Sequence, residues 1–237
     1  VKTIRFKDPA YIGDPVNTVR IFNELEVDEL CFLDIRATVE NRTPNLEVLQ
    51  HISNECFMPL SYGGGIKDFE TARAIMSIGF EKIVVNTESY YNPSLITQLS
   101  RHFGAQAVVA SIDVKKNLWG KYQVFIADGS VKTDIDVVEY ALRLQEAGAG
   151  EILLTSMDRD GTWSGFDIDL IKKVADALSV PLIANGGAGN TKHIGEAVKT
   201  GHASAVSLGS MIVYQQKGMG VLVNFPDKTE LEKMLQQ

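Results

Sequence analysis

The two halves of the sequence match each other, and this repeat restricts the folds that the chain can adopt. The run from Glu151 reads Glu-Ile-Leu-Leu-Thr-Ser, and 122 positions earlier the chain reads Glu29-Leu-Cys-Phe-Leu-Asp34. The same offset carries Gly186-Gly187 onto Gly64-Gly65. One half of the protein is therefore a copy of the other, and we expect a fold that two similar halves build together.

Apolar runs of strand length alternate with segments of helical periodicity along the whole chain. The strands are almost continuously apolar, as they are in a parallel sheet covered by helices on both faces. They are predicted at 29–35, 58–62, 82–86, 107–113, from 151 onward, at 181–185 and at 205–209. We expect a single (β/α)8 TIM barrel over residues 1–237, with half-barrels of about 1–103 and 104–237.

Eight parallel strands close such a barrel, whereas the predicted set contains seven. The repeat offset places the counterpart of the strand at 107–113 before Val1, so we expect the first strand to be missing from the chain. The prolines and glycine of segment 8–15 predict a loop. A second loop is expected after Asp113, running through Trp119 to Ser130.

The composition narrows the possible partners. With 237 residues and 45% apolar content, the chain can bury one large core. A net charge of −7 argues against nucleic acid or an anionic membrane as partner.

No transmembrane span or secretion signal is recognisable, so we expect a cytoplasmic protein. Cys31 and Cys56 lack C-x-x-C spacing and are expected to be reduced thiols, with no metal and no cofactor bound.

Small residues follow the predicted strands at equivalent places in both halves. A glycine cluster after one strand is most often a tight turn, but two equivalent clusters predict two phosphate sites, since backbone N–H groups there can approach an anion. The expected ligand therefore carries two phosphates on opposite sides of the barrel mouth, the opening at the carboxyl ends of the strands. The predicted phosphate-binding residues are Gly64, Gly65, Asn86, Thr87, Gly186, Gly187, Gly209 and Ser210.

Further polar residues end the same strands and complete a ring around the mouth, namely Asp34, Asp113, Thr155, Asp160 and Gly161. Asp113 would lie between the two phosphate sites, where a carboxylate suits general acid–base chemistry. Alternatively, it pairs with Lys115 or Lys116. Asp160 has two interpretations of equal weight, because it could accept a hydrogen bond from a substrate hydroxyl or cap a loop.

Three charged residues, Glu29, Lys82 and Glu151, begin strands at the opposite end of the expected barrel, which we call the bottom. Barrels ordinarily use this end for stability. A closed ring of opposite charges could plug the pore there. Ordinary salt bridges at the rim are an equally good interpretation of the spacing.

Several motifs together closely resemble the cyclase subunit of imidazole glycerol phosphate synthase, over nearly the whole chain to about Val213. They are Asp28-Glu-Leu-x-Phe-Leu-Asp34, Gly63-Gly-Gly-Ile66, Asn86-Thr87, the run from Gly148 to Thr162, and Asn185-Gly-Gly-Ala-Gly189. The resemblance implies a two-fold-repeated barrel with a glutaminase subunit at the bottom. Ammonia from that subunit would meet a bis-phosphorylated, nucleotide-like substrate at the mouth and give imidazole glycerol phosphate and an aminoimidazole carboxamide ribotide.

The same resemblance implies roles for individual residues. Asp113 corresponds to a catalytic aspartate and Lys2 to a loop lysine that acts in catalysis. Glu29, Lys82 and Glu151 correspond to three of the four members of an ammonia gate. The other catalytic aspartate and the fourth gate residue would lie in the absent strand.

Three departures from the family pattern leave the function open. Segment 6–15 is punctuated by prolines, Asn185 stands where the family usually has serine, and segment 211–226 is longer and more apolar. These features resemble a paralogous branch associated with surface-polysaccharide genes.

The departures leave three possible functions. The chain could be a histidine-pathway cyclase, or it could conduct ammonia to a sugar amidotransferase in lipopolysaccharide (O-antigen) biosynthesis. A sister sugar-phosphate isomerase is the least favoured, because it needs no gate at the bottom.

Overall fold

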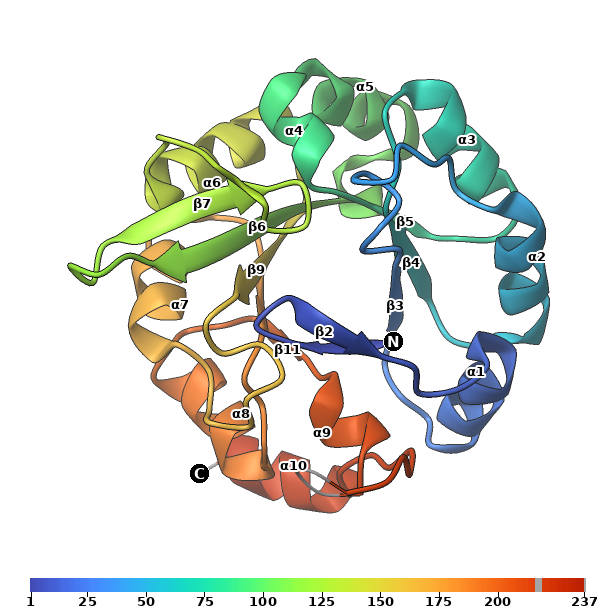
Figure 1. Cartoon of the computed structure of the whole chain (residues 1–237), viewed down its shortest axis with the longest axis vertical. Coiled ribbons are helices and arrows are strands. Elements are labelled where there is room, and N and C mark those ends of the chain that lie inside the picture. The colour runs from blue at the N-terminus through green and yellow to red at the C-terminus, as the bar shows by residue number, and fades with distance from the viewer. Residues whose placement is uncertain (216–218, 237) are drawn as a thin grey trace.

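Seven parallel strands form a curved sheet with helices around its outside (Figure 1). This computed structural model describes residues 1–215 and 219–236. Across the sheet the strands are β3 (Leu30–Leu33), β4 (Leu60–Gly63), β5 (Lys82–Val85), β6 (Val108–Lys116), β9 (Glu151–Ser156), β10 (Leu182–Asn185) and β11 (Ala205–Ser207). The architecture confirms the predicted (β/α)8 barrel class.

Helices alternate with these strands and cover the outer face of the sheet (Figure 1). They are α1 (Pro15–Glu24), α2 (Leu46–Glu55), α3 (Phe69–Ser77), α5 (Ser94–Phe103), α6 (Val137–Ala147), α7 (Ile168–Ala175) and α8 (Thr191–Lys199), while α10 (Lys228–Gln236) packs against α8. Seven of these helices begin after a residue whose side chain accepts a hydrogen bond from a first-turn N–H group, which stabilises the helix start. These caps are Asp14, Asn45, Asp68, Asp136, Asp167, Asn190 and Asp227.

The repeat offset is visible in the elements themselves. Helix α8 begins and ends 122 positions after α3, and β10 does the same relative to β4. Two short helices also correspond, because α4 (Thr87–Tyr91) follows β5 and α9 (Ser210–Val213) follows β11. The sequence patterns missed both short helices, since four or five residues are too few to display a helical period.

Strands β3 and β11 stand at the two ends of the parallel order, and the described residues contain no strand that pairs with both. Accordingly, Cys31 and Leu33 of β3 are exposed, whereas all four residues of β4 are buried. The expectation of a further strand stays a prediction.

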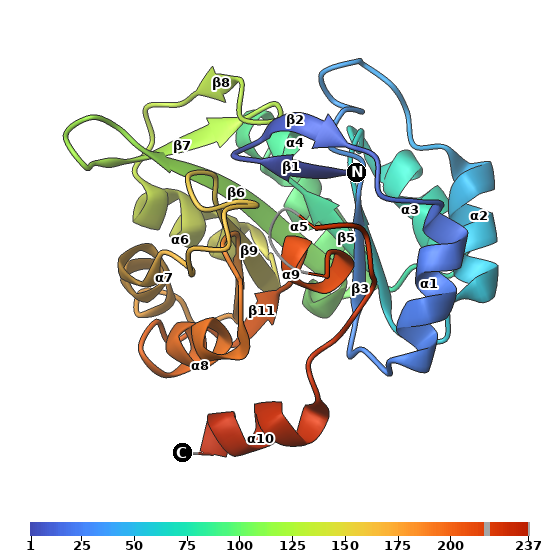
Figure 2. The same ribbon diagram turned by 60° about the horizontal axis from the view of Figure 1, so that its bottom comes forward.

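Two antiparallel hairpins lie above the sheet and correct two loop predictions (Figure 2). The first pairs β1 (Lys2–Ile4) with β2 (Lys7–Ala10), so residues 8–10 are not a loop. In the second, β6 continues past Asp113 and pairs with β7 (Tyr122–Ile126), which pairs with β8 (Val131–Lys132). A short 3-10 helix, η1 (Ala105–Ala107), precedes β6. In both regions the strands form because they pair with another strand. Local composition does not reveal such pairing, so the sequence predicted loops there.

Within the described residues, every helix is too short or too polar to cross a bilayer.

Candidate active site

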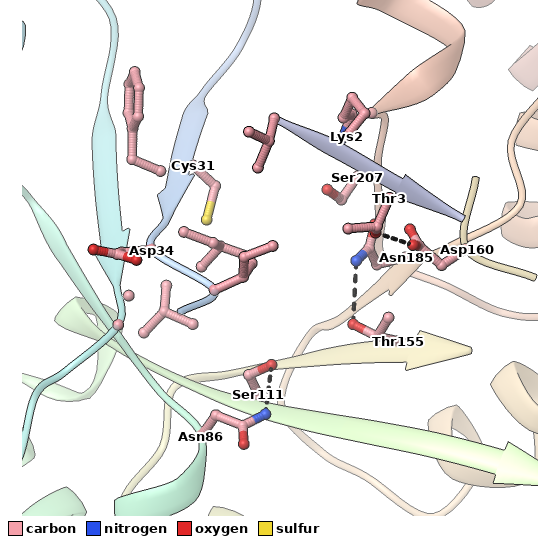
Figure 3. A pocket seen from close by; sticks show the side chains of 18 of the residues that line it. Lys2, Thr3, Cys31, Asp34, Asn86, Ser111, Thr155, Asp160, Asn185 and Ser207 are labelled. Atoms are coloured by element: carbon pink, nitrogen blue, oxygen red, sulfur yellow. Dashed lines mark hydrogen bonds between the residues drawn. The ribbon is translucent and has the colours of Figure 1, made fainter. Parts of the chain in front are cut away.

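A cavity of about 780 Å³ opens at the carboxyl ends of the strands, and both hairpins contribute residues to its wall. Figure 3 shows some of the side chains that line it. The structure brings every predicted catalytic and substrate-binding residue to its wall. These are Lys2, Asp34, Gly64, Gly65, Asn86, Thr87, Asp113, Thr155, Asp160, Gly161, Gly186, Gly187, Gly209 and Ser210. Their convergence follows from the parallel sheet, because all strand ends meet at one face. Their individual roles stay predictions.

Asp113 is the most deeply buried carboxylate of this cavity, with 7% of its surface exposed. Asn86 Nδ2 donates to its Oδ2 at 2.9 Å. Burial raises the pKa of Asp113 to about 7, and nearby negative charge contributes to the rise, although hydrogen bonds from Asn86 and Thr155 oppose it. Asp113 can therefore gain or lose a proton near neutral pH.

The alternative pairing of Asp113 with a neighbouring lysine is wrong. Lys116 Nζ instead lies 3.2 Å from Asp167 Oδ2, and Tyr122 donates its hydroxyl to Asp167 Oδ1 at 2.9 Å. Beyond Asp113, the β6 strand carries Lys116 away from the cavity and toward the start of α7. Asp113 thus remains available to a ligand.

Amide and hydroxyl side chains continue this polar network along the wall (Figure 3). Asn185 Nδ2 donates to Thr155 Oγ1 at 3.1 Å, so the residue that departs from the family pattern joins β10 to β9. On the other side, Asn86 Nδ2 also lies 3.5 Å from Ser111 Oγ. The network offers a ligand several donors and acceptors held on rigid strands.

The β1–β2 hairpin is docked onto the loop that follows β9. Thr3 Oγ1 donates to Asp160 Oδ2 at 2.7 Å, and Arg5 N donates to the carbonyl of Asp160 at 2.9 Å. Asp160 therefore binds the β1–β2 hairpin. This structural role is nearer to the loop-capping interpretation than to binding a substrate hydroxyl. Lys2 lies beside Gly209, and burial lowers the pKa of its ammonium group, although the charge of Asp160 opposes this shift.

At two of the predicted phosphate-site glycines, Gly64 and Gly187, the backbone conformation and close neighbouring atoms also require glycine. Gly64 has φ +125°, and a Cβ there would meet the Asp34 side chain at 2.9 Å. Gly187 has φ +111°, and a Cβ there would overlap the carbonyl oxygen of Gly165. A tight turn and an anion site both use this geometry, so the glycines fit both interpretations.

Two other predicted ligand residues are already engaged by protein groups. The carboxylate of Asp34 receives both terminal nitrogens of Arg42 at 3.0 and 3.2 Å. Thr87 Oγ1 accepts a hydrogen bond of 3.0 Å from Ala127 N and donates its own proton to Asn86 Oδ1 at 3.4 Å. Neither arrangement was visible in the sequence, because both partners come from loops.

Glu29, Lys82 and Glu151 meet at the bottom of the barrel. Lys82 Nζ lies 2.7 Å from Glu29 Oε2 and 2.8 Å from Glu151 Oε1. Burial lowers the pKa of Lys82, but hydrogen bonds and charge from the two glutamates outweigh it, so its pKa is raised. The contacts agree with a rim salt bridge and with a gate alike.

Sequence analysis missed two residues of the site. Thr3 fixes the hairpin, and Asp128 lines the cavity from the turn between β7 and β8. The signal for Asp128 was the Asp-Gly pair at 128–129, which is typical of hairpin turns. No group of three or more His, Cys, Asp or Glu residues suited to a metal ion occurs in residues 1–215 and 219–236.

The sequence profile of the family described as "Histidine biosynthesis protein" matches residues 1–218. The chain belongs to this family. Among its relatives, a Pseudomonas aeruginosa protein provisionally named imidazole glycerol phosphate synthase subunit hisF2 is 46% identical over 232 residues, covering 98% of this chain and 92% of the relative. The HisF subunit of Alkaliphilus metalliredigens is 43% identical over 216 residues, covering 91% and 86%.

A third relative within the histidine biosynthesis family is a Vibrio vulnificus protein provisionally named subunit hisF3. It is 41% identical over 237 residues, covering 100% of this chain and 91% of the relative. These matches confirm the resemblance to the HisF subunit that the sequence motifs indicated. The link to the surface-polysaccharide branch stays a prediction.

Proposed function

We propose that this protein is the cyclase-type subunit of an imidazole glycerol phosphate synthase. It takes ammonia from a glutaminase subunit at the bottom of the barrel and uses it at the mouth on a bis-phosphorylated, ribonucleotide-like substrate. Relatives of 41–46% identity carry the name of that synthase, which supports the assignment. The observation that carries it is the position of the charged cluster of Glu29, Lys82 and Glu151. This cluster and the cavity lie at opposite ends of the same strands.

Side-chain alternation produces this arrangement. Along β5, positions 82, 84 and 86 share one face, and along β9 positions 151, 153 and 155 do so. Each step of two residues covers roughly 6.6 Å, so the gate lysine lies about 13 Å along the strand from Asn86 at the cavity wall. The gate and the site are thus the two ends of one barrel interior.

An apolar layer separates these ends. Val84, Val109 and Leu153 form a small cluster apart from the main core, and Ile183 packs against it. Such a layer disfavours ions, which would lose their hydration, far more than a small neutral molecule. Ammonia can therefore pass where ammonium, hydroxide and glutamate cannot.

At the mouth, the two halves supply equivalent anion sites and Asp113 lies at the wall of the cavity between them. Backbone N–H groups near Gly65 and Gly187 hold the phosphates, with Lys2 beside the second site. Asp113 exchanges a proton with the reacting centre of the substrate. Binding both ends of the substrate places its middle against this carboxylate.

The test is turnover in the reconstituted complex. The protein, a glutaminase subunit and the bis-phosphorylated aminoimidazole ribonucleotide are incubated with glutamine, or without the glutaminase but with an ammonium salt at alkaline pH. Imidazole glycerol phosphate forms in both arms if the proposal is right. Its absence from both arms would refute the proposal.

One observation favours a second candidate, the delivery of ammonia to a sugar amidotransferase. The chain after α9 exposes apolar side chains at Met219, Val221 and Leu222, each between 47% and 54% exposed. Such a surface suits a further protein partner. This candidate predicts a glutaminase that is stimulated in the complex while the cyclisation product is absent.

A further inference from the structure

Four aspartates line the cavity, and neighbouring groups hold three of them. Asp34 binds Arg42, Asp113 accepts from Asn86, and Asp160 accepts from Thr3. Among the described residues, the carboxylate of Asp128 alone in this set has no hydrogen bond and no ion pair. It is half-buried, so it faces the cavity without full hydration.

The turn that carries Asp128 is fixed in place. Ala127 N donates to Thr87 Oγ1, which joins the turn to the end of β5. Gly129 packs so closely against Met157 and Phe6 that a Cβ would overlap the Met157 side chain. The turn is therefore attached to three different elements around the mouth, and Asp128 is held at the cavity wall.

The backbone of this turn is energetically unfavourable by itself. Ala127 and Asp128 both have left-handed conformations, with φ of 52° and 56°. Aspartate tolerates left-handed φ angles, whereas for alanine they are energetically unfavourable. The contacts around the turn must therefore maintain this conformation. The turn thus holds the Asp128 carboxylate at the cavity wall.

Asp128 and Asp113 are close enough for their charges to interact. The negative charge of Asp128 helps to raise the pKa of Asp113, after the larger effect of burial. Burial also raises the pKa of Asp128, while the positive charge of Arg36 opposes that rise. Two carboxylates in different surroundings commonly divide the acid and base roles of one reaction.

We propose that Asp128 is an additional acid–base carboxylate of this cavity and acts together with Asp113 on the ligand between its two phosphates. The inference rests on the proposed function and adds a residue to it. As ammonia forms its bond to an unsaturated carbon, the π electron pair moves to the heteroatom. Protonated Asp113 gives a proton to that atom, and ionised Asp128 removes one from the added nitrogen, so protons and charge balance.

The first experiment measures ammonium-driven turnover against pH for the wild type, Asp128→Asn and Asp128→Glu. The control is Asp134→Asn, which alters an aspartate whose side chain is 99% exposed. We expect Asp128→Asn to lower kcat about a hundredfold with KM nearly unchanged, the usual loss for a positioned base. It should also remove the fall in activity at acidic pH, and Asp128→Glu should restore part of the rate.

The second experiment needs no substrate and separates this inference from the proposed function. Carbon-13 NMR follows the titration of Asp113 in the wild type, Asp128→Asn and Asp134→Asn. Loss of the neighbouring charge should lower the pKa of Asp113 in Asp128→Asn only. If the wild type is inactive but this shift appears, the carboxylate pair stands and the cyclase assignment fails.

Two results would overturn the role of Asp128. One is an active enzyme whose Asp128→Asn variant keeps the turnover and pH profile of the Asp134→Asn control. The other is a titration of Asp113 that is the same with and without Asp128. Asparagine also tolerates the left-handed turn, so the variant should keep its fold, and circular dichroism checks this.

Discussion

Asn86, which follows β5, donates a hydrogen bond of 2.9 Å from Nδ2 to Oδ2 of Asp113, which lies within β6 at the cavity wall. The bond favours the ionised carboxylate, whereas burial favours the protonated one, and burial has the larger effect. The resulting pKa of about 7 lets Asp113 serve as an acid at neutral pH. The hydrogen bond from Asn86 thus limits the rise of the Asp113 pKa.

Asp113→Asn should reduce ammonium-driven turnover at least about a hundredfold, because asparagine cannot exchange a proton. In the wild type, activity that needs protonated Asp113 should fall as the pH rises through about 7. Steady-state kinetics between pH 5.5 and 9 (roughly the range bracketing this pKa) check both statements. Unchanged turnover would assign Asp113 a structural role only.

The same substitution should stabilise the fold at alkaline pH. The pKa of Asp113 is raised in the folded state from 3.8 to about 7, so the wild type loses stability as the pH rises through this window. Asparagine carries no charge and avoids the loss. At pH 8 the gain in the free energy of unfolding should approach roughly 4 kcal/mol, and it should vanish below about pH 4. Urea unfolding at several pH values measures the difference, and a gain that is the same at every pH would contradict it.

Ser210→Glu should weaken the binding of a sugar bisphosphate at least about tenfold, because Ser210 begins α9 at the cavity wall and the new charge repels a phosphate there. Ser210→Gln, of the same size but neutral, is the matched control and should bind nearly as the wild type does. Isothermal titration calorimetry gives both affinities. Equal losses in the two variants would show that bulk, not charge, matters at this position.

Asp167→Ala should destabilise the fold by roughly 2–4 kcal/mol. Asp167 is buried, caps α7 through Leu170 N, and also holds Lys116 and Tyr122 of the β6–β7 hairpin. Asp136→Ala removes a cap from α6 whose side chain is 45% exposed, and should cost only about 1 kcal/mol. Equal changes in the urea midpoints would show that the contacts to the hairpin contribute nothing.

The barrel, its repeat and the wall of the cavity could be predicted from the sequence. Apolar strands and their polar ends are local patterns, and the offset between Glu29 and Glu151 aligns both halves without any structure. The parallel arrangement of the strands then brings residues such as Asn86 and Asp113 to one face of the barrel. Residues on strands were therefore placed well.

The contacts that loops make with distant parts of the chain could not be predicted in this way. Asp128 lies at the cavity because the β7–β8 turn folds back over the mouth, and Asp34 is engaged because Arg42 reaches it from a later loop. Thr3 meets Asp160 across 157 positions of chain. Such contacts depend on cross-strand pairing and loop paths, which leave no periodic signal in the sequence.

The most direct test of the central claim, that ammonia passes from the bottom of the barrel to the mouth, is the ratio of cyclisation product to glutamate in the reconstituted complex. Lys82→Gln removes the cation between Glu29 and Glu151, while Lys121→Gln alters an exposed lysine in the turn before β7 and serves as control. The wild type and the control should form one product per glutamate. Lys82→Gln should fall well below one while keeping its turnover with an ammonium salt. A ratio of one for Lys82→Gln would contradict the account, because ammonia transfer would then not depend on the charged cluster.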